Sequence, residues 1–179
     1  MTTTTPIGEL TGDYVFDSAR TRVGFVAKAM LVTKVRGQFD EFEGSAHLDG
    51  GDPSKSTAQF SIRARSIQTR NQKRDDHLRS GDFLDVDNHP ALTFTSTRVR
   101  QVHQAGFQVT GDLTIRGVTK PVTVDFELTG AENDPQGSAH VRFAGSTTIN
   151  RNDWAVSGGK GMVGPKVTLE IEVVAVRQP

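Results

Sequence analysis

Apolar and polar side chains alternate along much of the chain. The segment Val122–Thr129 reads Val-Thr-Val-Asp-Phe-Glu-Leu-Thr, so every second residue is apolar. Successive side chains of a β-strand point to opposite faces, and this period of two therefore predicts a strand with one buried and one solvated face. The same alternation is found in residues 58–64, 92–95, 107–115, 139–143 and 167–173.

Three further strands are expected where the alternation is less regular, at residues 14–17, 22–30 and 38–48. In the last of these, Phe39 and Phe42 fall out of step, which indicates a bulge. Glycine and proline separate the strands, as in Gly50-Gly51-Asp52-Pro53, because these residues adopt the backbone angles that turns require. Short gaps favour antiparallel hairpins, and about eight half-buried strands predict an all-β barrel or sandwich.

One segment interrupts the β pattern. Thr69-Arg70-Asn71-Gln72 resembles a capping box, and residues 71–80 then read as a short helix that ends at Gly81. The irregular return after this helix offers apolar residues for burial at Phe83, Leu84 and Val86. No repeat or linker divides the chain, so we expect a single domain over residues 12–178, preceded by a flexible tail over residues 1–11.

Composition narrows the function. The chain has 179 residues, no cysteine and equal numbers of acidic and basic residues. The absence of cysteine excludes thiol catalysis, disulfides and iron–sulfur clusters, and the zero net charge argues against a nucleic-acid partner. The first residues lack the basic and apolar regions of a secretory signal, and no apolar stretch has the ~18 residues of a membrane-spanning helix. We therefore expect a cytoplasmic protein.

Residues that could carry chemistry form only weak motifs. Gly159–Gly164 matches the glycine pattern of dinucleotide sites, but Pro165 and a strand follow it where such a site needs a helix, so it is read as a loop. The cluster Arg74-Asp75-Asp76-His77 places carboxylates beside a histidine, yet adjacent residues on a helix point in different directions. The other histidines are isolated in sequence, and we predict neither a metal site nor a catalytic residue.

The predicted inward faces combine large and very small side chains. Phe60 and Ile62 alternate with Ala58 and Ala64, and similar mixtures surround Phe25, Phe42 and Phe143. Small inward residues can leave space inside a closed eight-stranded sheet, which is wide enough to hold one ligand. Large and small residues can equally interdigitate to fill a tapering barrel. The pattern leaves both open, as it does for the single tryptophan, Trp154, which either stacks on a ligand or plugs a barrel end.

Several motifs follow one another in a fixed order. They are Gly37-Gln38-Phe39-Asp40-Glu41-Phe42-Glu43-Gly44, then Arg74–Val86, Gly111–Val122 and Ile149–Trp154. Over Tyr14–Val176 the chain resembles the YceI-like family of lipocalin-like proteins, with one departure at Ala155, where the family commonly has glycine. The resemblance implies an extended eight-stranded antiparallel barrel with one short helix near an end and an elongated apolar interior. It also implies a long isoprenoid ligand, of polyprenyl phosphate or quinone type, and a homodimer.

On this resemblance we predict a protein that binds an isoprenoid inside the barrel for transport, storage or sequestration, with no other cofactor and with transient membrane contact. The residues expected to line the interior are Phe25, Ala27, Phe42, Gly44, Phe60, Ile62, Ala64, Phe94, Phe126, Phe143 and Trp154. A phosphate head group would need cations, for which Arg70, Lys73, Arg74 and Arg79 beside the helix are candidates. Two alternatives stay open: an enzyme acting on the lipid through Asp75, Asp76 and His77, and a protein-interaction barrel with a filled core.

Overall fold

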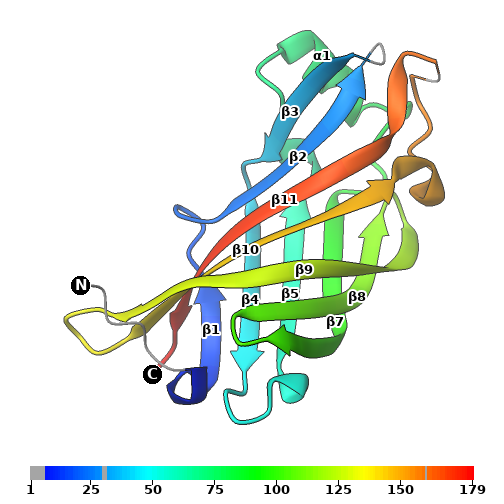
Figure 1. Ribbon diagram of the computed structural model, residues 1–179. Coiled ribbons are helices and arrows are strands. Elements are labelled where there is room, and N and C mark those ends of the chain that lie inside the picture. Colours follow the sequence, from blue (N-terminus) through cyan, green and yellow to red (C-terminus); the bar gives the residue numbers. More distant parts are fainter. Residues whose placement is uncertain (1–6, 30–31, 160) are drawn as a thin grey trace.

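A computed structural model describes residues 7–29, 32–159 and 161–179 of the chain. They form a closed antiparallel β-barrel with one short helix at one end (Figure 1). The strands of this part of the chain are β1 (Gly12–Phe16), β2 (Arg22–Ala29), β3 (Thr33–Phe39), β4 (Phe42–Leu48), β5 (Thr57–Arg63), β6 (Ile67–Gln68), β7 (Ala91–His103), β8 (Gly106–Ile115), β9 (Val118–Asn133), β10 (Ala139–Asn150) and β11 (Val163–Arg177). The helix α1 spans Gln72–Arg79 and lies between β6 and β7 in sequence.

These segments make eight barrel strands because the first three are each broken in two. The long strand β11 pairs with β1 through its last residues and with β2 through the rest. The next barrel strand consists of β4, which pairs with β1, and β3, which pairs with β2. The third consists of β5, which pairs with β4, and β6, which pairs with β3. The prediction of an extended eight-stranded antiparallel barrel with one helix is therefore confirmed.

The break between β1 and β2 has a local cause. The backbone turns at Asp17, whose carbonyl accepts hydrogen bonds from the backbone N–H groups of Arg20 and Thr21. Thr21 is buried, and its Oγ1 both donates to the carbonyl of Val174 and accepts from the N–H of the same residue. The Val174 carbonyl also accepts from the N–H of Asp17, and the threonine hydroxyl gives the Val174 N–H an acceptor at the turn, so the barrel wall stays closed across the kink.

Two strand predictions need correction. The expected strand 38–48 with a bulge is instead the end of β3 and the whole of β4, separated at Asp40 and Glu41. Ala64, expected at the end of a strand, begins the 3₁₀ turn η3 (Ala64–Ser66), and its N–H donates to the carbonyl of Pro90. The last residue of the expected strand 22–30, Met30, lies outside the described residues, as does Lys160 in the expected loop 159–164.

The helix is confirmed, but its cap differs from the expected capping box. Asn71 is the N-cap residue, and its side chain accepts from the N–H of Arg74. Thr69 turns inward instead, where its N–H and hydroxyl both donate to the buried carboxylate of Asp75. This contact joins the start of α1 to the end of β6 and sets the position of the helix on the barrel.

Residues 7–10, which the sequence assigns to a flexible tail over residues 1–11, instead pack against the barrel. The 3₁₀ turn η1 (Ile7–Glu9) leads to Leu10, which is only 1% exposed. Leu10 packs in a cluster with Tyr14 and Val141, and its carbonyl accepts a hydrogen bond from the Tyr14 hydroxyl at 2.8 Å. The segment 7–10 therefore closes part of the barrel end opposite α1, whereas residues 1–6 lie outside the described part of the chain.

Candidate ligand-binding cavity

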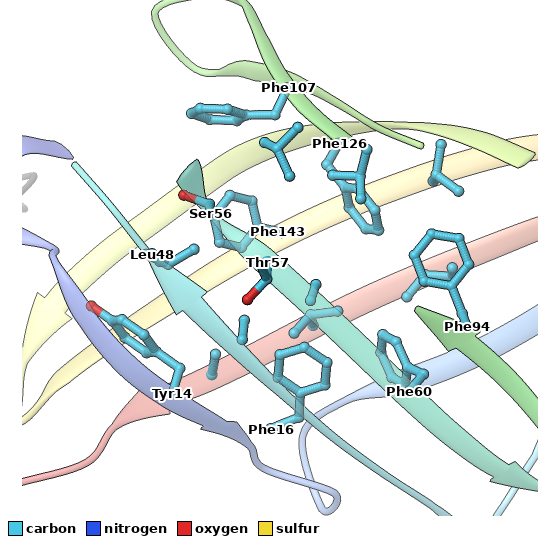
Figure 2. Close-up of a pocket in the computed structure, with 18 of the residues that line it drawn as sticks. Tyr14, Phe16, Leu48, Ser56, Thr57, Phe60, Phe94, Phe107, Phe126 and Phe143 are labelled. Atoms are coloured by element: carbon cyan, nitrogen blue, oxygen red, sulfur yellow. The ribbon is translucent and has the colours of Figure 1, made fainter. Parts of the chain in front are cut away.

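An apolar cavity of about 170 Å³ lies inside the barrel (Figure 2). Side chains from all eight barrel strands line it, among them Phe16, Phe60, Phe94, Phe107, Phe126 and Phe143. A dry cavity of about 150 Å³ with aliphatic and aromatic walls is large enough to bind benzene. As it stands, the space accepts one compact apolar group, and a longer chain fits only if aromatic side chains change rotamer.

Four of the phenylalanine rings lie on glycines of the neighbouring strand. A Cβ atom built on Gly145 would come within 2.4 Å of the Phe126 ring, and one on Gly44 within 2.3 Å of the Phe16 ring. The other two pairs are Gly37 with Phe25 and Gly111 with Phe94. Because glycine has no side chain, each ring can lie close to the barrel wall, as in the aromatic coverage of strand glycines. The mixture of large and small residues therefore packs the wall and still leaves a cavity.

The polar residues of the lining are concentrated at one end. Asp49 and Ser56 belong to the connection between β4 and β5, which also contains the 3₁₀ turn η2 (Pro53–Lys55), and Thr57 is the first residue of β5. The Ser56 hydroxyl accepts a hydrogen bond from the N–H of Asp49 at 2.9 Å. Nearby, burial raises the pKa of the Tyr14 hydroxyl above its ordinary value, against a smaller lowering by Arg177. A ligand with one polar group would meet polar side chains only at this end of the lining.

The end near α1 is closed by a plug, which we define as residues 81–86 and 151–156. Phe83, Leu84 and Val86 are buried there beside Trp154, which lies in the 3₁₀ turn η4 (Arg151–Trp154). The Trp154 indole donates from Nε1 to the carbonyl of Leu113 at 2.9 Å. The sequence leaves two roles open for this tryptophan, contact with a ligand or closure of a barrel end. Its position in the plug and outside the cavity lining favours closure of the end.

Arginines fix the plug through backbone carbonyls. Arg151 is 7% exposed and donates to the carbonyls of Val156, Val163 and Gly164 at 2.7, 2.9 and 3.0 Å. Its guanidinium also lies 5.8 Å from the centre of the Phe83 ring. Burial lowers the pKa of Arg151 below its ordinary value, but a guanidinium stays protonated at neutral pH. Arg116 makes a similar tie, with two bonds of 2.6 Å to the carbonyls of Gly81 and Phe83.

The predicted interior residues fall into two groups. Those that line the cavity are Phe60, Ile62, Phe94, Phe126 and Phe143; those that do not are Phe25, Ala27, Phe42, Gly44, Ala64 and Trp154. Phe25 and Phe42 pack against the buried cluster around the plug, Gly44 lies under the Phe16 ring, and Ala64 is buried in η3. Their contact with ligand stays a prediction.

The predicted interior residues omit several lining residues, among them the aromatic side chains of Tyr14, Phe16, Phe39 and Phe107. Tyr14 and Phe16 lie on β1, a strand of five residues, which is too short for a clear alternation. The signal that would have found Phe16 is its place beside Gly44. That relation depends on the pairing of β1 with β4 and is invisible until the register is known.

The predicted head-group cations do not reach the cavity. Arg74 donates to the hydroxyl and carbonyl of Thr69, and Arg79 donates to the carbonyls of Arg65 and Ile67. Arg70 and Lys73 are exposed. None of the four lines the cavity, because the plug separates the helix from it. The four cations do lie beside the helix, but the helix end of the barrel is the closed one.

The acidic cluster on α1 does not form a catalytic arrangement. Asp75 is buried and accepts from Thr69, whereas Asp76 is exposed and pairs with Arg79 at 3.1 Å. His77 contacts Asp82 at 2.9 Å and stands edge-on to the Phe83 ring. The three side chains have separate partners, and none lines the cavity. Among the described residues, no group of three His, Cys, Asp or Glu side chains is placed to hold a metal ion.

An eight-stranded antiparallel barrel around an apolar cavity, closed at one end and polar at the rim of the other, defines a lipocalin-like protein. The chain belongs to the YceI-like domain family, whose model matches residues 14–175. It is 37% identical over 156 residues to a UPF0312 protein of Pseudomonas paraeruginosa, which covers 87% of this chain and 81% of the relative. A UPF0312 protein of Azotobacter vinelandii is 34% identical over 171 residues, covering 94% of this chain and 89% of its own.

Solved structures agree with this assignment. BcnA of Burkholderia cenocepacia superimposes with a TM-score of 0.80 at 25% identity, over 89% of this chain and 98% of that one. A YceI protein of Campylobacter jejuni gives a TM-score of 0.78 at 27% identity, over 83% of this chain and 88% of that one. A domain from Saccharophagus degradans, described as polyisoprenoid binding, gives 0.67 at 16% identity over 93% and 98% of the two chains, and that likeness shows the fold alone.

No helix in the described ranges combines the length and hydropathy that crossing a bilayer requires.

Proposed function

We propose that the protein binds one isoprenoid chain in the barrel cavity and carries or stores it. The observation that carries the proposal is the cavity itself, which has apolar walls along its length and polar side chains only at the β4–β5 connection. Membership of the YceI-like family and the structural likeness to a domain described as polyisoprenoid binding support the same ligand class.

The orientation of the ligand follows from the two ends. Apolar carbons of a ligand need no hydrogen-bond partner at the plug end, where the lining consists of apolar residues such as Leu113, Ile115 and Phe39. A hydroxyl or phosphate would lose its hydration there without gaining a partner, which is unfavourable. The head group is therefore placed beside Asp49, Ser56 and Thr57. Asp49 carries negative charge in this position, so a neutral hydroxyl or quinone fits better than a bare phosphate.

Binding strength is expected to depend on the tail. Burying one five-carbon unit contributes roughly 3 kcal/mol gross, of which lost freedom of ligand and side chains removes a large part. The cavity of about 170 Å³ is too small for several units with its rings in place. We infer that Phe60, Phe94 and Phe126 change rotamer when the tail enters. This change is possible because the three side chains are not fully buried.

The test uses delipidated protein, farnesol and a nine-unit polyprenol, with binding followed by native mass spectrometry. Ala58 lines the cavity beside the polar end, and Ala58→Phe places a ring in the path of the ligand. The matched control is Thr95→Phe, whose side chain is exposed on the neighbouring strand β7. We expect Ala58→Phe to lower affinity at least tenfold for both alcohols and the control to bind like wild type.

Two results would overturn the proposal. If wild-type protein binds neither alcohol and releases no apolar compound on solvent extraction, the barrel is a filled module of another function. If both alcohols bind and Ala58→Phe leaves them unaffected, the ligand lies outside the cavity. The enzyme alternative would be favoured instead by chemical change of a bound alcohol, and by its loss in His77→Ala.

A further inference from the structure

The tip of the β2–β3 hairpin lies beside the turn that precedes β11. Ala29, the last residue of β2, is paired with Val163, the first residue of β11, so the two chain reversals are neighbours. In Figure 1 the described ends of β2 and β3 and the start of β11 project together at the plug end of the barrel. Met30, Leu31 and Lys160 lie outside the described residues and are not counted in this surface.

The two most exposed large apolar side chains of the described chain lie on these two neighbouring turns. Val32 is 84% exposed and Met162 is 63% exposed, whereas Val15 and Val102, on other parts of the barrel, are 47% and 46% exposed. Single exposed apolar residues are normal on a protein surface, but two on adjacent turns form a small exposed apolar patch. Nothing in the folding of the barrel requires them, because neither belongs to a buried cluster.

Three lysines lie on the strands that lead into these two turns. Lys28 and Lys34 stand directly opposite each other across β2 and β3, and Lys166 lies on the irregular stretch of β11 next to Lys28. All three are exposed, and within the described ranges no carboxylate comes within 4 Å of their amino groups. Like charges directly opposite on paired strands destabilise a sheet. A chain of zero net charge thus concentrates unpaired positive charge at one tip.

We propose that this tip, made of Lys28, Val32, Lys34, Met162 and Lys166, docks on the surface of an anionic lipid bilayer. Lysines near such a surface are attracted by its negative potential, and apolar side chains on protruding turns gain by entering the headgroup region. A soluble polyanion would use the lysines but gain nothing from Val32 and Met162. The bilayer is the partner that explains both kinds of residue. The proposal goes beyond the ligand in the cavity and holds for the protein without it.

The test is flotation of delipidated protein with vesicles of phosphatidylcholine alone and of phosphatidylcholine with phosphatidylglycerol, at low salt. We expect binding only to the anionic vesicles, weakening with added sodium chloride. The double variant Lys28→Gln/Lys34→Gln is expected to weaken partitioning about 25-fold, which is about fivefold for each lysine. Val32→Ser and Met162→Ser should each weaken it severalfold. All these positions are exposed, so the variants should fold like wild type.

Matched controls come from the same barrel. Lys120→Gln removes an exposed lysine of β9, and Val102→Ser removes an exposed valine near the β7–β8 turn; neither should change partitioning. Equal binding to both vesicle types, no binding to either, or equal losses in the controls would overturn the proposal. Loss with the lysine variant but none with Val32→Ser and Met162→Ser would also overturn it, and would instead indicate a site for soluble polyanions.

Discussion

The two ends of the barrel are held in different ways. At the plug end, Arg151 and Arg116 donate to backbone carbonyls, and Arg151 as a residue is only 7% exposed. At the opposite end, side chains pair with each other near solvent: Asp17 with Arg20 at 2.8 Å, and His140 with Asp134 at 2.9 Å. Such partly exposed pairs are screened by salt, whereas removal of a buried donor leaves its acceptors unsatisfied.

This difference suits a container that is loaded from one side. The plug end resists change because its bonds join charged donors to main-chain carbonyls of three separate segments. The other end contains the polar cavity rim and combines the buried cluster of Leu10, Tyr14 and Val141 with ion pairs near solvent, such as His140 with Asp134, which salt can weaken. Under the proposed function, this is the end through which a ligand passes.

The largest predicted effect comes from breaking the plug. Arg151→Met fills a similar volume but leaves the carbonyls of Val156, Val163 and Gly164 without their donor, and we expect a loss of about 3 kcal/mol in the free energy of unfolding. Urea denaturation measures it. Arg142→Met is the control, because Arg142 is 46% exposed and pairs with Glu132 at 3.5 Å, so it should cost less than about 1 kcal/mol. Similar losses of stability in the two variants would show that the hydrogen bonds from Arg151 do not stabilise the plug more than a surface ion pair does.

The second prediction concerns the wall between the ends. Gly145→Ala puts a methyl group where the Phe126 ring lies, and the ring must move into the cavity, at a cost of about 2 kcal/mol. The control is Gly130→Ala on β9, where a Cβ atom would meet only Arg142 at 3.5 Å, and a change within about 0.5 kcal/mol is expected. Adding Phe126→Leu to Gly145→Ala should recover part of the loss. If it recovers none, the ring does not rest on the glycine.

The third prediction raises stability at the plug end. Ala155 has φ of 61°, a left-handed conformation that an alanine adopts only with strain. Ala155→Gly should therefore stabilise the protein by about 1 kcal/mol in urea denaturation. Ala144→Gly is the opposite control, because Ala144 is an exposed residue of β10 with ordinary strand geometry, and it should lose about 0.5–1 kcal/mol. Loss of stability in both variants would mean that the turn after Trp154 is unstrained.

The alternation of the sequence predicted an all-β barrel or sandwich, and the family resemblance selected the barrel, but neither located the cavity lining fully. Period two shows which side chains point inward, and Phe60, Phe94 and Phe126 were placed correctly for that reason. Period two does not show the register between strands, so it could not predict that the Phe16 ring packs on Gly44. Nor does it show which end is closed, because Arg151 closes it through carbonyls of residues 5 to 13 positions away that have no side-chain signature.

The last and smallest predicted effect is a pH dependence that arises at Asp134, at the end opposite the plug. Asp134 lies in the β9–β10 turn, where Oδ2 accepts from His140 and Oδ1 accepts from the N–H groups of Gln136 and Ser138, each at 2.9 Å. The hydrogen bond from His140, followed by that from the N–H of Ser138, lowers the pKa of Asp134 below its ordinary value of 3.8. Arg20 can only donate to Nδ1 of His140, so Nε2 carries the proton given to Asp134.

The sign of the dependence comes from this lowering. A carboxylate whose pKa is lower in the folded state stabilises the fold above its ordinary pKa and loses that contribution as pH falls through the folded value. Asp134→Asn cannot accept from His140 through its amide nitrogen, so its Tm should lie below that of wild type at pH 7. The difference should shrink as pH falls below 3.8 and the wild-type carboxylate is protonated. Thermal melts over this range measure it, with Asp125→Asn, an exposed residue of β9, as the control. A constant difference at all pH values would assign the effect of the substitution to the turn backbone and not to the carboxylate charge.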